Sequence, residues 1–284
     1  MDTTHTAGEE WELHEQLVAY SRAWARHNIY FGFSSTRRRL EEHARIFSTA
    51  CVDVYPQTPA PTFRSGASLP REFRLGIALM SKSLVYRFPH RHPISMQRGT
   101  VNERFLDPDM FREELCAPQL STMPHGGIVI LPIEQIYNTE GISSTLFLER
   151  LRGFLRALPV NYRYAVELHN REYLLPGYLD MLRTRHVAHV LVACAEMPDL
   201  LEQIQLPRVL TTNVAVVRAM HPMDTELQLG IMETIRRCVE ERVTLYIYLD
   251  GGSEACSTHH AIARLMESLN PDLAKLSPIK NLAA

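Results

Sequence analysis

The chain has 284 residues, of which 45% are hydrophobic and 22% are charged, and its net charge at pH 7 is −2. This length suits one large domain or two small ones with a substantial buried core. A nearly neutral chain has no overall basic field, which excludes tight, sequence-independent DNA binding through bulk charge. Any nucleic-acid binding would need a local cluster of Arg and Lys.

The five cysteines are scattered along the chain and form no CxxC pair. They are Cys51, Cys116, Cys194, Cys238 and Cys256. An odd number without paired spacing is typical of a reducing compartment rather than of a secreted disulfide scaffold. We interpret all five as small, buried apolar residues.

The N-terminal sequence is acidic, with Glu9, Glu10 and Glu12, where a signal peptide would carry basic residues and then an apolar run. No apolar stretch approaches the roughly 20 residues of a membrane-spanning helix. We therefore expect a cytoplasmic protein without a membrane partner.

Residues 1–28 form a separate extension in this interpretation. Apolar residues between Trp11 and Trp24 recur at helical spacing, which predicts one amphipathic helix. Its two tryptophans suggest a surface for a protein partner or for self-association.

From residue 29 onward, short apolar runs typical of strands alternate with helical segments. The runs lie at residues 29–33, 51–55, 73–79, 127–133, 163–168, 189–194, 214–218 and 244–249. Helical periodicity covers Arg38–Phe47, Ser144–Leu158, Arg171–Thr184, Glu226–Glu241 and Thr258–Leu269. Alternation of this kind predicts parallel strands joined by right-handed crossovers.

Eight such units match a TIM-type α/β barrel of eight parallel strands in size. An open doubly wound sheet is the competing fold, but no GxGxxG follows the first strand. We predict one barrel domain over residues 29–270 and a tail over residues 271–284. The long connection at 80–126 predicts a lid or an excursion that carries short helices.

Several segments resemble the YecE-like family, also called domain of unknown function 72. They include LEEHARIFSTACVDV (40–54), GGIVILPI (126–133), LERLRGFLRALPVNYRYAVELHNREY (148–173) and TLYIYLDGGSEACSTHHAIARLMESL (244–269). The resemblance covers roughly residues 29–270. It implies a TIM-type barrel similar to the endonuclease IV and xylose isomerase groups, but the family has no settled activity to transfer.

The resemblance is closer for scaffold residues than for polar ones. Glu167 and Arg218 fall on the family's Glu and Arg, whereas Ala78 and Ile130 stand where the family has Lys and Gln. His169 and Asn170 stand where the family has Arg-His, and Asp250 and Gly251 stand where it has an Asn pair. Met220 stands where the family has a His, although His221 is adjacent. Asp53 matches the family's strand-two motif only with a one-residue shift.

Active sites of such barrels lie at the C-terminal ends of the strands. This rule selects Asp53, Glu134, Gln135, Glu167, His169, Arg218, His221 and Asp250. Glu167 lies among apolar strand residues, so its charge needs a partner, and Arg218 is the expected one. The pair is either a general base or ligand carboxylate with an anion clamp, or a structural ion pair that closes the barrel mouth.

Arg37 and Arg38 follow the first strand and open the next helix, where free backbone N–H groups favour a phosphate. The alternative is a solvated basic run. The HxH of His90 and His92 lies in a loop and predicts no metal site. GxSxG is absent, and no cysteine stands in a known Cys/His signature.

Three functional hypotheses remain open, and none identifies a cofactor. The first is binding of an anionic or phosphorylated ligand, or of nucleic acid, at the barrel mouth, with Glu167 as the acid/base candidate. The second is a non-catalytic scaffold that has lost the family's polar site. The third is a metal-dependent phosphodiesterase similar to endonuclease IV.

Overall fold

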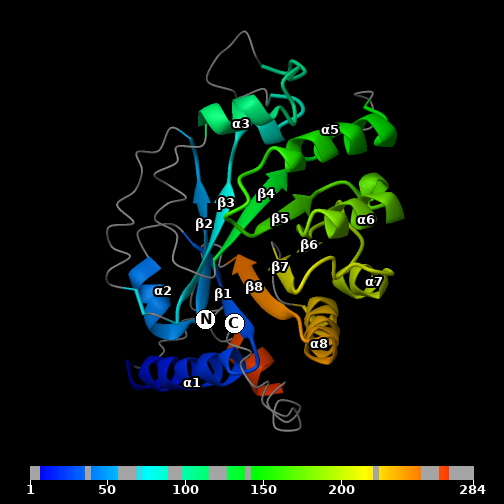
Figure 1. The fold of residues 1–284 in the computed structure, drawn as a ribbon. Coiled ribbons are helices and arrows are strands. Elements are labelled where there is room, and N and C mark those ends of the chain that lie inside the picture. The colour runs from blue at the N-terminus through cyan, green and yellow to red at the C-terminus, as the bar shows by residue number, and fades with distance from the viewer. Residues whose placement is uncertain are drawn as a thin grey trace.

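The computed structural model describes residues 7–35, 40–56, 69–70, 72–88, 98–114, 127–137, 142–219, 224–250 and 262–268. Its centre is a closed barrel of eight parallel strands in sequence order (Figure 1). The strands are β1 (Ile29–Ser35), β2 (Thr49–Val54), β3 (Arg74–Leu79), β4 (Ile128–Ile133), β5 (Tyr164–Leu168), β6 (Ala188–Ala193), β7 (Val214–Ala219) and β8 (Thr244–Asp250). All eight predicted strands and the TIM-type barrel are confirmed.

Helices surround the barrel. They are α1 (Ala7–Ala25), α2 (Leu40–Ile46), η3 (Lys82–Leu84), α3 (Pro108–Glu114), α5 (Ser144–Arg156), η6 (Arg171–Tyr173), α6 (Pro176–Thr184), α7 (Leu200–Gln205) and α8 (Thr225–Glu240), with a further helical stretch at 262–268. The predicted single helix over Arg171–Thr184 is wrong. It divides because a residue before proline avoids the helical conformation, so Leu175 is extended and α6 begins at Pro176.

Each strand buries both faces, because alternate side chains point to the helices and into the barrel. The interior set includes Cys51, Ala78, Ile130 and Tyr248. Tyr248 fills space that Gly76 leaves open, since a Cβ atom at position 76 would lie 2.5 Å from the tyrosine Oη. The barrel is therefore a packed core rather than a pore.

In Figure 1, α1 lies beyond the starts of β2 and β3, whereas α3 lies beyond their arrowheads. Trp24 of α1 is 1% exposed and packs edge-on against Phe31, with ring centroids 6.0 Å apart. The expectation that Trp24 offers a contact surface is therefore wrong, because its ring is already buried within the chain. The side chain of Trp11 lies outside the described residues.

The described part of the 80–126 excursion packs against the barrel helices. Phe111 of α3 is buried and contacts Phe154 of α5, with ring centroids 4.9 Å apart. The side-chain amide of Asn102 donates hydrogen bonds to two backbone carbonyls of the η3 region. Short helices occur here as expected, while His90 and His92 lie outside the described residues. Within the described ranges, no helix has the length and apolar character needed to cross a membrane.

Candidate functional site

Four polar side chains from four strands meet at the C-terminal end of the barrel. They are Ser34 of β1, Asp53 of β2, Glu167 of β5 and Arg218 of β7. The strands position them because side chains of parallel barrel strands alternate between interior and exterior. All four lie at or near the end of their strand, where this fold places its active sites.

Arg218 is at the centre of this cluster, and its side chain is only 8% exposed. Nη1 donates to Glu167 Oε2 at 2.6 Å, and Nη2 lies 3.7 Å from Asp53 Oδ1. Nη2 also donates weakly to Ser34 Oγ at 3.5 Å. Among the described residues, nothing accepts a hydrogen bond from the buried Nε. The guanidinium is thus held firmly on one edge and remains a donor on another.

Glu167 is 1% exposed, and both of its oxygens are engaged. Oε2 accepts the bond from Arg218, and Oε1 lies 2.8 Å from His169 Nε2. Burial alone would raise the pKa of Glu167, but Arg218 and His169 outweigh burial and lower it. Glu167 is therefore ionised at neutral pH, although it lies in the barrel interior.

His169 lies just after β5 and is mostly buried. Its Nδ1 is 3.9 Å from Cys194 Sγ, on the side opposite Glu167. Burial opposes protonation, but the contacts with Cys194 and Glu167 outweigh it and raise the pKa of His169 to about 10. Glu134, at the end of β4, faces the same region, and desolvation raises its pKa against the opposing charge of His169.

The interior directly beneath the cluster is apolar. Cys51, Ala78 and Ile130 are each 0% exposed. Burial raises the pKa of Cys51 to about 12, so this thiol stays neutral next to Arg218. The charged side chains of the described barrel interior are therefore concentrated at its C-terminal mouth.

A model of the family described as "Protein of unknown function DUF72" matches residues 135–282, which is more than half of the chain. The chain belongs to the DUF72 family. The resemblance suggested by its strand and helix segments is thereby confirmed.

Two solved DUF72 structures are similar to this DUF72 chain. A DUF72 family protein from Enterococcus faecalis V583 shares 15% sequence identity, with a TM-score of 0.56 over 85% of this chain and 97% of the other. A DUF72 family protein from Thermotoga maritima MSB8 shares 14% identity, with a TM-score of 0.53 over 85% and 99%. At this identity the likeness shows the fold alone. No curated protein matches the sequence.

The structure brings together four of the predicted site residues of this DUF72 protein, namely Asp53, Glu167, His169 and Arg218. The expected contact between Glu167 and Arg218 is present. Asp250 ends β8 opposite Ser34 in register, but its side chain lies outside the described residues. Arg37, Arg38 and His221 also lie outside them. The roles assigned to all these residues remain predictions.

Sequence reasoning missed Ser34 of the cluster and Cys194 beside it. Cys51 and Cys238 are buried as expected, but Cys194 is half-buried beside His169, so its interpretation as a buried apolar residue is wrong. Its position directly after β6 was the available signal, because the strand-end rule that selected His169 applies equally to it. Cys116 and Cys256 lie outside the described residues.

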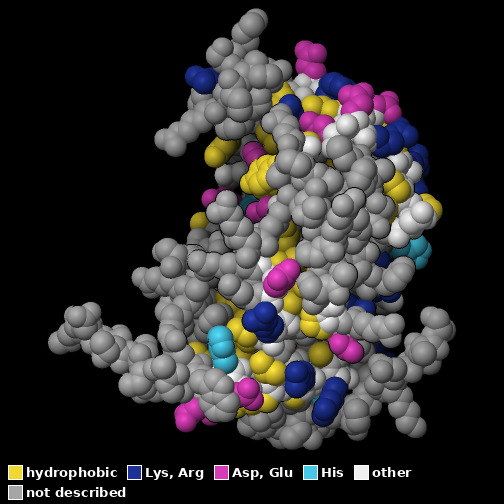
Figure 2. Space-filling model, turned by 90° about the vertical axis from the view of Figure 1, so that its left-hand side faces the viewer, with side chains coloured by type: hydrophobic (Ala, Val, Ile, Leu, Met, Phe, Trp, Pro, Cys, Tyr) yellow, Lys and Arg dark blue, Asp and Glu magenta, His cyan; other side chains and the backbone are white. Residues whose placement is uncertain are grey.

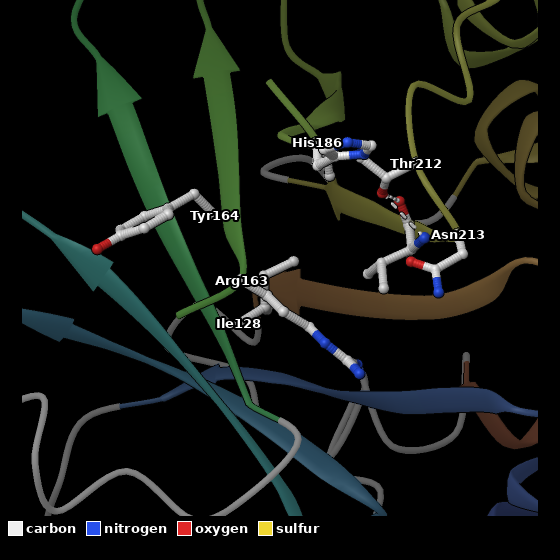
Figure 3. Close-up of a pocket in the computed structure, with 8 residues that line it drawn as sticks. Ile128, Arg163, Tyr164, His186, Thr212 and Asn213 are labelled. Atoms are coloured by element: carbon white, nitrogen blue, oxygen red, sulfur yellow. Dashed lines mark hydrogen bonds between the residues drawn. The ribbon is translucent and has the colours of Figure 1, made fainter. Parts of the chain in front are cut away.

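The described part of this DUF72 chain has a cavity away from the Arg218 cluster and no group of metal ligands. Across the ranges that the structure describes, no three His, Cys, Asp or Glu side chains are grouped to hold a metal ion. A cavity of about 300 Å³ lies at the opposite end of the barrel, where β4 to β7 begin. Figure 3 shows Tyr164 pointing away from His186, Thr212 and Asn213 there. This cavity is separate from the Arg218 cluster.

Proposed function

We propose that this DUF72 protein binds a small anionic ligand, with a phosphate or carboxylate group, at the C-terminal mouth of its barrel. The buried Arg218 carries this proposal, because its Nε has no acceptor among the described residues. A buried donor without an acceptor costs roughly 1–3 kcal/mol, and in native proteins such a group usually meets water or an ion. Guanidinium groups bind phosphate and carboxylate through two parallel hydrogen bonds.

The charges around Arg218 also support an anion. Glu167 neutralises part of the arginine charge, but protonated His169 adds a second positive charge to the cluster at neutral pH. Ser34 adds a hydroxyl group near Nη2. Arg37 and Arg38, which follow β1 in sequence, are the predicted second contact for a phosphate.

Glu167 takes a positioning role in this proposal. At 1% exposure, with both oxygens bonded to Arg218 and His169, its carboxylate has no free oxygen for a ligand. Asp53 is the more accessible carboxylate, with 42% of its side chain exposed. Acid/base chemistry on a bound ligand would therefore involve His169 or Asp53 rather than direct contact with Glu167.

A small ligand fits the surface better than a nucleic acid does. On the face drawn in Figure 2, the described Lys and Arg side chains are interspersed with acidic and hydrophobic ones and form no basic patch. Nucleic-acid backbones are bound through several clustered Lys and Arg contacts. The described side chains of this face therefore give no support to binding of a nucleic-acid backbone there.

The test is calorimetric titration with inorganic phosphate, pyrophosphate and a panel of sugar phosphates. The Arg218→Lys variant keeps the positive charge but loses the fork of donors, so we expect at least tenfold weaker binding. Arg236→Lys is the matched control, because Arg236 is 56% exposed on α8 and pairs with Glu233 and Glu240. This control should bind like the parent.

Two results would overturn the proposal. One is the absence of binding by any anion in the panel to the parent protein. The other is equal affinity of the parent and a folded Arg218→Lys variant, since the guanidinium fork would then contribute nothing.

A further inference from the structure

Cys194 lies beside the Arg218 cluster but takes no part in the proposed anion binding. It follows β6 directly and is half-buried. It also lines a cavity of about 230 Å³, which the starts of α7 and α8 enclose together with the end of β6. A ligand in this cavity would therefore lie beside Cys194.

The surroundings of Cys194 match the arrangement of an activated nucleophile. His169 Nε2 lies 2.8 Å from the Glu167 carboxylate, which can only accept, so this nitrogen carries a proton. In the imidazolium, which the raised pKa of His169 favours, Nδ1 carries the second proton and faces Cys194 Sγ at 3.9 Å. Nucleophilic sulfur, imidazolium and orienting carboxylate are thus spatial neighbours in that order, an arrangement that favours the thiolate.

Two other charged groups, Arg218 and Glu134, influence the protonation of His169. Arg218 holds the carboxylate of Glu167 in place from the far side. Glu134, at the end of β4, adds a negative charge that favours the imidazolium form. The imidazolium form of His169 beside Cys194 is therefore supported from β4, β5 and β7.

We propose that Cys194 is a nucleophilic thiol, activated by His169, that reacts with small electrophiles carrying a positive charge. The cavity decides the class of electrophile, because its lining includes the carboxylates of Asp199, Asp224 and Glu226. Asp199 and Asp224 cap helix starts, whereas Glu226 is exposed in the first turn of α8 and has no ion-pair partner among the described residues. A cationic group is favoured there over an anionic one.

The covalent step needs no further reactant. With Cys194 as the thiolate and His169 as the imidazolium, Sγ attacks the carbonyl carbon of an aldehyde. The carbon–sulfur bond forms, the π electron pair moves to the oxygen, and the oxygen takes the Nδ1 proton. The product is a thiohemiacetal, and oxidation states are unchanged.

The chain supplies internal controls for the reactivity of Cys194. Cys51 and Cys238 are both 0% exposed, and burial raises the pKa of each to about 12. Neither thiol should react while the protein is folded. Peptide mass mapping separates them from Cys194 and from the remaining cysteines.

The experiment compares two methanethiosulfonate reagents on the folded full-length chain, one with a trimethylammonium group and one with a sulfonate group. In either case a disulfide forms on Sγ and methanesulfinate leaves with its electron pair. At pH 6.5 we expect the ratio of the cationic to the anionic labelling rate to be at least tenfold higher for Cys194 than for a free thiol such as glutathione. Glu226→Gln should reduce this ratio.

His169→Gln tests the activation, because it removes the imidazolium while keeping a side chain of similar size. Labelling of Cys194 at pH 6.5 should slow about tenfold, and the difference should shrink toward pH 9, where any exposed thiol ionises. If this variant does not fold, the pH dependence of the labelling rate of Cys194 in the parent protein tests the activation. A rate that is nearly flat between pH 6 and 8.5 supports activation, whereas a tenfold rise per pH unit overturns it.

The two proposals fail separately. Fast labelling of Cys194 without phosphate binding would overturn only the anion site. Phosphate binding that depends on Arg218, together with slow labelling unaffected by His169→Gln, would overturn only the reactive thiol.

Discussion

The two halves of the barrel interior differ in kind, although the same strands build both. Toward the strand starts, Tyr30 stacks on Tyr246 with ring centroids 5.2 Å apart, and Tyr246 stacks on Tyr248 at 6.3 Å. Toward the strand ends, Glu167 and Arg218 keep buried charges. Burial of the aromatic rings stabilises the folded state. Burial of the charges of Glu167 and Arg218 costs desolvation free energy. We therefore expect the charged half to serve a function other than stability.

The largest expected effect comes from removing one partner of the buried ion pair. Glu167→Leu leaves the Arg218 charge largely uncompensated and should lower the free energy of unfolding by roughly 3–5 kcal/mol. Arg218→Met should have an effect of similar size. Urea denaturation followed by circular dichroism measures both.

The double variant Glu167→Leu with Arg218→Met decides whether the pair stabilises the fold. Replacement of both charges by apolar groups removes the desolvation cost, so we expect a stability within about 1 kcal/mol of the parent. A double variant as unstable as the single ones would show that the charged half is required for folding, and the contrast between the halves would disappear.

The pH dependence of stability should differ between the halves. His169 binds its proton more tightly in the folded protein, with its pKa raised to about 10 from an ordinary value of 6.5. This stabilisation is complete below pH 6.5 and is lost as the pH rises toward 10, at no more than about 1.4 kcal/mol per pH unit. Burial raises the pKa of Tyr246 to about 12. Ionisation of tyrosine in the aromatic half therefore lowers the stability of the fold only above pH 10.

Denaturation of the parent and of His169→Gln at pH 7, 8 and 9 measures this difference. The parent should lose stability across the range, and the variant should lose less. If the free energy of unfolding fell equally with pH in the two proteins, this would contradict a strong interaction of His169 with Cys194 and Glu167.

A smaller loss is expected from Gly76→Ala in the aromatic half. The new Cβ would lie 2.5 Å from Tyr248 Oη and 2.8 Å from Cζ, so the buried ring must shift. Overpacking of this kind typically costs about 1–3 kcal/mol. Gly153→Ala on α5 is the matched control, because nothing lies within 4 Å of its added Cβ and the change should stabilise the helix slightly.

The smallest effect should come from Tyr248→Phe, which removes one hydroxyl group from the same place. Thr49 Oγ1 donates to this oxygen at 3.3 Å, a long bond, so we expect a loss of about 1 kcal/mol or less. Combined with Gly76→Ala, it should relieve part of the crowding, and the double variant should be more stable than the sum of both losses predicts.

The strands were predictable because β4 is apolar along its whole length and β5 is apolar apart from Glu167, as buried parallel strands are. The helix α7 was missed, since a six-residue helix is too short to show periodicity. The contact of Glu167 with Arg218 was predictable for a different reason. A charge in a buried strand needs a partner, and the strand ends offered Arg218.

The sequence by itself determined the barrel, the family and the strand-end position of Glu167, because local periodicity and the order of segments specify strands and crossovers. Only the tertiary structure decided that Cys194 lies 3.9 Å from His169 and that Trp24 is buried. Residues 25 positions apart become neighbours through the register of β5 and β6 and the strand-end loops, and no local pattern encodes that distance.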